Sequence, residues 1–485
     1  MARRNAQRNL VRMVLVGWVL ISAVSAAPAA VRLPEIFSDN MVLQRERPVP
    51  VWGWAEPGNE VTVTVAGQSA SAKAAPDGRW KATLPKLPAG GPHDVVVQEA
   101  GGPSVTLKNV LVGEVWLCSG QSNMEWSVAA SLKPQEEIAA AKYPKIRLFN
   151  VQKKTADKPQ DDCKGAWAEC SPKSVPNFSA VGYFFIRHLH KELDVPAGMI
   201  ESAWGGTAAE AWTCRKALES EPSFKPMLDR WDLGKAPPGD ANRPANLYNG
   251  MIAPLAPFAM RGAIWYQGES NCGRAYQYRT LFPMMINNWR TAWGQGDFPF
   301  GVVQLAPFRG YEGGDKGVTC AELREAQTMT VQKLPNVGMA VTMDISDLND
   351  IHPKNKQDVG SRLALWALAK VYGKDIVYSG PVYKSMSVEG SKVRICFDHV
   401  GGGLVTRDGK PPGDFVIAGE DQQFAPATAA IDGDAVVVSS EQVAKPVAVR
   451  FGWRDAAEPN LANKEGLPAC PFRTDQWKGV TEGRN

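Results

Sequence analysis

Residues 110–124 read VLVGEVWLCSGQSNM and carry the strongest structural signal in the chain. The first ten are apolar and rich in β-branched side chains, which predicts a buried strand. The strand leads directly into a turn that exposes the Ser122 hydroxyl at the strand's carboxyl end, where open α/β sheets bind their ligands. Residues 124–130 predict a helix whose free N–H groups point at the same place. The simpler interpretation is that Ser122 only caps this helix.

A second motif far downstream supplies a base that could activate this serine. Residues 344–353 read DISDLNDIHP and follow another apolar strand, at 337–343. A serine hydroxyl is a poor nucleophile until a base takes its proton, and imidazole suits that task near neutral pH. His352 is therefore the predicted base, with Asp350 favoured as the acid that orients it. The other candidates for the acid are Asp347 and Asp344, and a Ser-His dyad without an acid is a further alternative.

The rest of the chain divides into three predicted parts of α/β and β character. Strands and helices alternate through residues 109–375, which predicts an α/β domain with a parallel sheet flanked by helices. A polar, proline-rich stretch at 216–244 interrupts this rhythm and is interpreted as an insertion. Short alternating runs separated by turns predict β-sandwich-like modules at 31–108 and 376–485, with the second packed beside the first.

Composition and the N-terminus restrict the class and the location of the protein. The formal net charge is +4 and the basic residues are dispersed, so a nucleic-acid partner is not expected. Residues 1–26 combine arginines, a short apolar run and a small-residue end, which is typical of a secretory signal peptide. We expect a periplasmic or secreted protein with no membrane span after removal of the signal. The sequence does not indicate an oligomeric state.

The chain contains eight cysteines, an even number for an exported protein. Cys163 and Cys170 lie close together in a polar stretch and are candidates for a disulfide, whereas Cys118 and Cys396 lie in predicted strands and are expected to be buried thiols. No cysteine or histidine spacing typical of a zinc site is present. No metal and no cofactor are predicted.

Five separated motifs resemble the sialate O-acetylesterase family of SGNH-type hydrolases, and the likeness runs from about Leu33 to the C-terminus. The motifs are GQSNM at 120–124, ESAWGGT at 201–207, WYQGESN at 265–271, DIHPKNK at 350–356, and GLP at 466–468 followed by PFRT at 471–474. Many SGNH enzymes place the acid three residues before the histidine, where this chain has Asn349. The resemblance implies an SGNH-like fold and a serine esterase that removes acetyl groups from sugars.

The tetrahedral intermediate of such a reaction needs hydrogen-bond donors for its oxyanion. The Ser122 backbone N–H is one candidate, and the resemblance points to Gly206 as the second, with Gly205 as its alternative. The Gln267 side-chain amide is a third. Two further polar residues, expected to support Gln267 or Ser122, are Glu269 and Asn271. Aromatic residues that either stack on sugar or pack in the core are Trp126, Trp204, Trp265 and Tyr266.

The expected partner is an O-acetylated carbohydrate. The predicted activity is removal of O-acetyl groups from acetylated sialic acid or related sugars through an acetyl-enzyme. Arg274 is a candidate for binding a sialic acid carboxylate. The alternatives are an acetyl xylan esterase of the same family and a non-catalytic glycan-binding protein. A serine peptidase or lipase is a weaker alternative, since the sequence has no long apolar lid segment.

Overall fold

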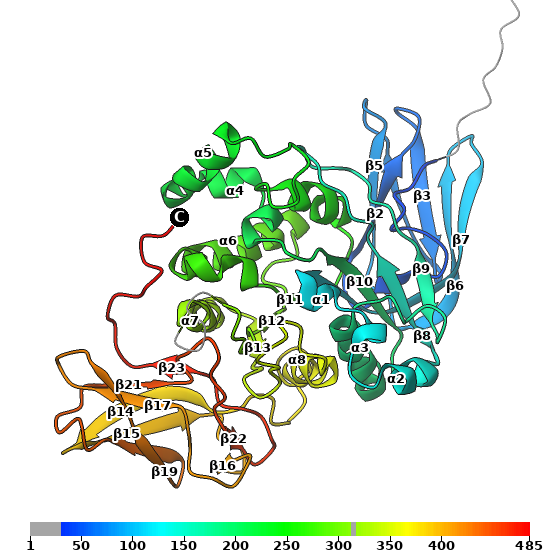
Figure 1. The fold of residues 1–485 in the computed structure, drawn as a ribbon. Helices are drawn as coiled ribbons and strands as arrows, with labels where there is room; N and C mark the ends of the chain where they lie inside the picture. Colours follow the sequence, from blue (N-terminus) through cyan, green and yellow to red (C-terminus); the bar gives the residue numbers. More distant parts are fainter. Residues whose placement is uncertain (1–30, 312–316) are drawn as a thin grey trace, which may run out of the picture.

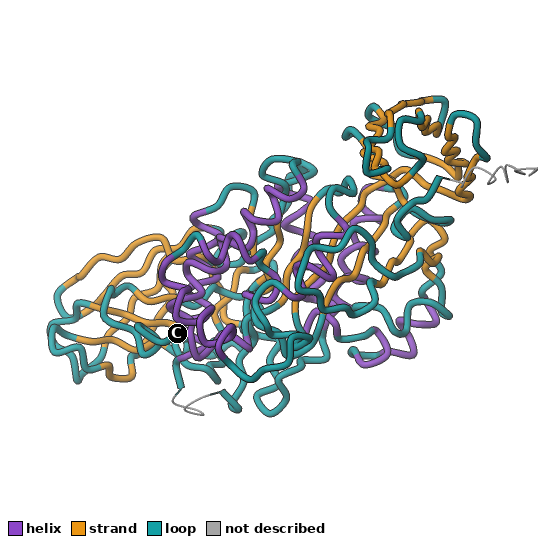
Figure 2. Tube along the Cα trace, turned by 90° about the horizontal axis from the view of Figure 1, so that it is seen from above, coloured by secondary structure: helices purple, strands orange, loops and turns teal. Residues whose placement is uncertain are grey.

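The computed structural model describes residues 31–311 and 317–485. The signal peptide predicted at 1–26 lies outside these residues. Strands of the N-terminal part and strands of the C-terminal part lie at opposite ends of the molecule, with the helices between them (Figures 1 and 2). The expectation that the two β modules pack beside each other was therefore wrong. Within the described residues, no helix combines the length and the apolar character needed to cross a membrane.

Strand β7 (Ser104–Gly120) connects the N-terminal module to the central domain. Its first half pairs antiparallel with β6 of the N-terminal module, and its second half pairs in parallel with β10 and β11. Residues 110–120 are all buried, whereas exposed and buried residues are mixed over 104–109. This difference follows from the surroundings, because a strand inside a parallel sheet is covered on both faces. The predicted boundary between residues 108 and 109 falls inside this strand.

The central sheet has the order β13-β12-β11-β7-β10-β8-β9. Neighbours from β13 to β8 are parallel, and the edge strand β9 is antiparallel, so the predicted parallel sheet is in fact mixed. The strands other than β7 are β8 (Tyr143–Asn150), β9 (Trp167–Cys170), β10 (Ala197–Ala203), β11 (Gly262–Tyr266), β12 (Phe300–Val303) and β13 (Val337–Ala340).

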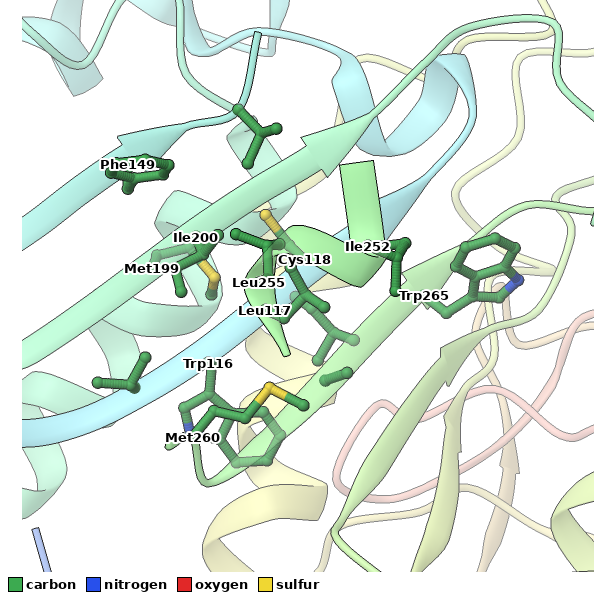
Figure 3. Close-up of a cluster of buried hydrophobic side chains, with 14 of the residues drawn as sticks. Trp116, Leu117, Cys118, Phe149, Met199, Ile200, Ile252, Leu255, Met260 and Trp265 are labelled. Atoms are coloured by element: carbon green, nitrogen blue, oxygen red, sulfur yellow. The ribbon is translucent and has the colours of Figure 1, made fainter. Parts of the chain in front are cut away.

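Helices cover both faces of this sheet, as the alternation of the sequence predicts. On one face Trp116 of β7 packs edge-on against Phe185 of α3, with ring centroids 4.9 Å apart. On the other face Trp265 of β11 packs against Trp289 of α6 at 5.7 Å. Figure 3 shows part of this core, where Trp116, Leu117 and Cys118 project from β7 among side chains of the neighbouring elements. The strand end that carries Ser122 is therefore held between two packed layers.

The insertion predicted at 216–244 contains short helices. The α-helices are α1 (Ser122–Glu125), α2 (Pro134–Ala140), α3 (Ala180–Leu193), α4 (Arg215–Glu219), α5 (Lys225–Leu233), α6 (Ala275–Trp293), α7 (Thr319–Lys333) and α8 (Lys356–Lys370). Short 3-10 turns are η1 (Val128–Ala130), η2 (Ala209–Trp212), η3 (Pro222–Phe224), η5 (Ala253–Leu255) and η6 (Glu269–Arg274), and η4 (Tyr248–Ile252) is a π-helical turn.

The N-terminal module consists of short strands around an apolar core. Antiparallel pairs join β2 to β5, β3 to β4 and β3 to β6, and β1 runs parallel to β7. The strands are β1 (Val42–Gln44), β2 (Val49–Trp54), β3 (Glu60–Val65), β4 (Gln68–Lys73), β5 (Arg79–Leu84) and β6 (Gly90–Glu99). One face of the Trp54 ring is covered by the Arg32 guanidinium, 3.4 Å from the ring centroid.

The C-terminal module contains two four-stranded sheets with the orders β14-β15-β20-β19 and β18-β17-β21-β23, and a separate β16-β22 pair. Apolar side chains of both four-stranded sheets form one buried cluster, as in a β-sandwich. The strands are β14 (Val382–Glu389), β15 (Lys392–Asp398), β16 (Leu404–Thr406), β17 (Phe415–Ala418), β18 (Phe424–Pro426), β19 (Thr428–Asp432), β20 (Ala435–Ser439), β21 (Ala448–Phe451), β22 (Leu461–Asn463) and β23 (Phe472–Arg473).

A disulfide joins Cys272 in η6 to Cys320 at the start of α7. Cys163 and Cys170 are buried free thiols, so the proposed pairing of these two was wrong. Closeness in sequence does not predict a disulfide, because the bond requires two cysteines whose Cα atoms lie near each other and whose side chains face each other in the fold.

Candidate active site

The structure brings Ser122 and His352 into direct contact. The His352 Nε2 atom lies 2.9 Å from the Ser122 Oγ atom, across 230 residues of sequence. Ser122 stands at the carboxyl end of β7, and His352 lies in the loop between β13 and α8. Because β7 and β13 belong to the same parallel set, their carboxyl ends share one edge of the sheet. A hydroxyl and an imidazole at this distance can exchange a proton.

Gly120 permits the turn that presents Ser122. Its φ is +143°, and a Cβ atom at this position would lie 2.1 Å from the Tyr266 carbonyl oxygen. The next residue, Gln121, donates its backbone N–H to the same carbonyl at 3.0 Å. The end of β7 therefore lies directly against β11, and only glycine fits there.

The helix after Ser122 is shorter than the sequence predicted. Helix α1 ends at Glu125, and Trp126 leaves the helical conformation with φ −53° and ψ 117°. A single turn lacks the aligned peptide dipoles of a longer helix, so the expected stabilisation by a helix N-terminus does not apply. The short turn instead places Trp126 over the catalytic candidate His352, with ring centroids 4.5 Å apart and planes at 14°. The Trp126 Nε1–H donates to the Ala130 carbonyl at 2.8 Å, which fixes the indole.

Of the three acids proposed for His352, only Asp350 approaches the imidazole. Its Oδ1 atom lies 3.6 Å from His352 Nδ1 and also accepts the His352 backbone N–H at 2.9 Å. Asp344 forms a two-pronged ion pair with Arg362, and the Asp347 carboxylate accepts the Asn349 N–H. The Asp350 side chain is 43% exposed, and 3.6 Å exceeds normal hydrogen-bond distance. The ring of His352 is thus held by stacking as well as by this carboxylate.

We expect Asp350→Asn to reduce kcat/KM only about 2- to 5-fold, because an ion pair this exposed contributes about 0.2–1 kcal/mol. A buried triad acid contributes about 10⁴-fold. Hydrolysis of p-nitrophenyl acetate by the purified variant measures the effect. A loss near 10⁴-fold would mean that Asp350 closes onto His352 during the reaction.

A buried polar network lies behind the Ser122–His352 pair. The Asn123 side-chain amide donates to Glu269 at 2.6 Å and to the Ile351 carbonyl at 3.0 Å, and its oxygen accepts from Lys356 at 2.5 Å. The network thus connects the residue after Ser122 to the residue before His352. Burial raises the pKa of Glu269, and burial lowers the pKa of Lys356 to about 7. Glu269 therefore lies behind the Ser122–His352 pair and contacts it through Asn123.

The pKa of His352 is lowered below its ordinary value, chiefly by burial and then by the positive charge of Lys356, while Asp350 opposes the shift. A general base must be neutral, so activity that depends on His352 is present above its pKa and is lost as the pH falls through it. We therefore expect the lowered pKa of His352 to extend activity into mildly acidic solution.

Lys356→Met is expected to move the acid limb of the kcat/KM profile to higher pH, because removal of a nearby positive charge raises the pKa of His352. Asp350→Asn is expected to move the same limb to lower pH. The matched control is Lys354→Met, which removes an exposed lysine two residues away. The pH profiles of kcat/KM are measured with p-nitrophenyl acetate. Acid limbs that coincide for wild type and Lys356→Met would show that the charge of Lys356 does not lower the pKa of His352.

The two candidate glycines for the oxyanion site occupy different environments. The Gly205 N–H donates to the Glu125 carboxylate at 2.6 Å and is therefore engaged, although a Cβ at Gly205 would lie only 3.3 Å from Ser122 Cβ. Gly206 has φ +72° with open space where a side chain would point. Among the bonds of the described residues, neither the Gly206 N–H nor the Ser122 N–H has an acceptor. These two groups remain the candidates for oxyanion donors.

Gln267 and Asn271 do not face the serine. Gln267 is fully buried, and its amide donates to the Thr207 carbonyl at 3.1 Å and to the Asn271 side chain at 2.7 Å. Asn271 in turn accepts the Ala209 N–H and donates to Glu210. Because both amide hydrogens of Gln267 are already bonded, it is a supporting residue of the loop after β10 in this structure and not an oxyanion donor. Trp265 and Tyr266 are likewise fully buried core residues.

Ser122 and His352 open into a pocket of about 570 Å³. Three of its charged residues, Glu125, Lys153 and Glu201, were given no role from the sequence. Glu125 bonds to Lys153 at 2.5 Å, and Glu201 projects into the wall from β10. Glu201 is the one charged residue of the strand at 197–203, which was a usable signal, whereas nothing in the sequence marked Lys153. In the parts of the chain described here, no group of three or more metal-binding side chains occurs.

Comparisons with known proteins identify the family and the fold of the chain. Residues 112–369 match the model of a family described as carbohydrate esterase, sialic acid-specific acetylesterase. The chain is 33% identical over 430 residues to the sialate O-acetylesterase of Mus musculus, covering 76% of this chain and 79% of that one. The likeness to the human sialate O-acetylesterase is 33% over 402 residues, 75% and 76% of the two chains.

A solved structure described as a novel carbohydrate acetylesterase from Xanthomonas citri has a TM-score of 0.85 and 44% identity, covering 92% of this chain and 100% of that one. Fold and site together define a carboxylic ester hydrolase that acts on acetylated carbohydrate. The chain belongs to the sialic acid-specific acetylesterase family of carbohydrate esterases.

Proposed function

We propose that the protein is an exported serine esterase with an SGNH-like catalytic domain, which removes O-acetyl groups from sugars through an acetyl-enzyme intermediate. The observation that carries the proposal is the 2.9 Å contact between Ser122 Oγ and His352 Nε2 in an open, polar pocket. Family membership supports the substrate class, and the contact supports the mechanism.

The reaction begins when Ser122 Oγ attacks the acetyl carbonyl carbon and His352 Nε2 takes the hydroxyl proton. The N–H groups of Ser122 and Gly206 stabilise the oxyanion of the tetrahedral intermediate. On collapse, the bond from the acetyl carbon to the sugar oxygen breaks and His352 returns the proton to that oxygen. Water then attacks the acetyl-enzyme, His352 accepts its proton, and acetate leaves as Ser122 regains its hydrogen.

The substrate is proposed to be an acetylated sialic acid or a related acetylated sugar, and the second candidate is acetylated xylan. The curated relatives named as sialate O-acetylesterases favour the first. Arg274, expected to meet a sialic acid carboxylate, instead pairs with Glu210 at 2.6 Å. Acetate release from acetylated sialic acid and from acetylated xylan, measured side by side, distinguishes the substrates. No acetate from either substrate, or equal slow release by wild type and Ser122→Ala, would leave the non-catalytic glycan-binding alternative.

The proposed export rests on the signal-like residues 1–26 and is supported by the Cys272–Cys320 disulfide, since such bonds persist in oxidising compartments. We expect the processed chain in the periplasm or the medium, beginning at Ala27. A full-length chain retained in the cytoplasm would refute export without affecting the esterase proposal.

A further inference from the structure

Glu201 is a buried carboxylic acid in the wall of the active-site pocket. It lies near the carboxyl end of β10, two residues before the strand ends, and its exposed fraction is 3%. The pocket that it lines also contains Ser122 and His352. The mechanism described above does not use it.

The contacts of Glu201 leave its charge uncompensated. Its Oε2 atom accepts the Ser179 N–H at 2.8 Å and a longer bond of 3.5 Å from the Asn150 amide. Within the described residues it forms no ion pair, because the nearby Lys153 bonds to Glu125 instead. A buried carboxylate without a cation is costly, and the group protonates in preference.

Neighbouring groups act on the ionisation of Glu201 in both directions, and the hydrogen bond from the Ser179 N–H favours the charged form. The charge of Glu125 from α1 disfavours ionisation of Glu201, Lys153 from the segment after β8 favours it, and the Cys118 thiol of β7 pairs with Glu201 in the sheet register. The largest cause is burial, and together these effects raise the pKa of Glu201 to about 8. At neutral pH the group therefore carries a proton that it can donate as a hydrogen bond.

We propose that Glu201 is a substrate-binding residue whose carboxylic acid hydrogen-bonds to a hydroxyl of the sugar held at Ser122. The proposal rests on the proposed function, since it assumes that the pocket holds the sugar of an acetyl ester. The acid is fixed at one oxygen by Ser179, which orients the carboxyl group within the cavity wall. An acid ionised above its pKa loses the donor and places a second carboxylate beside Glu125.

The test compares substrates with and without a sugar. Wild type, Glu201→Ala and Glu201→Gln are assayed with p-nitrophenyl acetate and with the acetylated sugar that wild type hydrolyses better. Glu201→Ala is expected to lower kcat/KM for the acetylated sugar about 10-fold, mainly through KM, which is the scale of one lost hydrogen bond to substrate. Its kcat/KM for p-nitrophenyl acetate should change less than 3-fold. The control Glu136→Ala removes an exposed carboxylate of α2 and should change neither.

The pH profile provides the second readout. With the sugar substrate, wild type is expected to lose activity as the pH rises through about 8, where Glu201 ionises. Glu201→Gln keeps a hydrogen-bond donor that does not titrate, so this alkaline decline should disappear from its profile. Lys356 also titrates near neutrality. Its ionisation should change the hydrolysis of both substrates equally, so the pH profile with p-nitrophenyl acetate shows the contribution of Lys356 without that of Glu201.

If Glu201→Ala lowered kcat/KM equally for both substrates, the proposal would be overturned. Such a result would show that Glu201 only holds the start of α3 in place through its hydrogen bond with the Ser179 N–H. Unchanged sugar hydrolysis would overturn it as well. Should Glu201→Ala not fold, the Glu201→Gln profile decides, and an alkaline decline like that of wild type counts against the proposal. Wild-type protein that hydrolyses neither ester would refute the proposed function itself, which is a different outcome.

Discussion

Ser122→Ala is expected to lower kcat for ester hydrolysis by roughly 10⁴- to 10⁶-fold, because the variant has no atom to attack the acetyl carbonyl. The protein should still fold, since the Ser122 side chain bonds only to His352 among its described contacts. Hydrolysis of p-nitrophenyl acetate and acetate release from an acetylated sugar measure the loss, and thermal unfolding checks the fold. Wild type quenched during turnover should carry one acetyl group on the peptide that contains Ser122.

The matched control is Ser127→Ala, which removes a hydroxyl from the same pocket without touching His352. It should retain activity within a few-fold of wild type. More than about a hundredth of wild-type kcat in Ser122→Ala would contradict a serine nucleophile, given the loss expected for such a residue.

His352→Ala is expected to cost nearly as much as Ser122→Ala, because a serine hydroxyl without its base stays protonated. The stronger test is the double variant. Residues that act as one unit are not additive, so Ser122→Ala with His352→Ala should be no slower than the slower single variant. Kinetics of the two single variants and the double variant in one assay give the comparison.

A suitable control is His188→Ala on α3, whose imidazole contacts Ser361 and lies outside the pocket. It should leave kcat unchanged within a few-fold. If the double variant were slower by the product of the two single effects, Ser122 and His352 would act independently and the proton-transfer step would be wrong.

Two sequence motifs, together with the family resemblance, predicted that Ser122 and His352 meet. They did not indicate where the neighbouring side chains point. The apolar run before Ser122 and the strand before His352 each end at the same edge of the sheet, as expected for parallel strands that alternate with helices. Gln267 also follows a strand, yet its amide points inward to Thr207 and Asn271. Which side of a strand end a polar side chain occupies depends on partners far away in sequence, so the sequence could not decide it.

The early end of α1 has a similar cause. Residues 124–130 include good helix formers, and propensity alone favours a longer helix. The stacking of Trp126 on His352 is a tertiary contact formed only in the folded protein, and the chain leaves the helical conformation at that residue. For Glu201 the sequence shows an acid within a largely apolar strand, but it does not show the pocket that this acid lines.

Strand β7 joins the N-terminal β module rigidly to the segment that carries Ser122. One continuous backbone is hydrogen-bonded to the module at its start and to the central sheet at its end, and Ser122 follows two residues after Gly120. No flexible tether exists at that junction, so the module cannot swivel as a detachable carbohydrate-binding unit would. Deleting it would strip the pairing partners from half of the strand on which the serine stands, and exchanging it between relatives would require the whole strand to be exchanged with it.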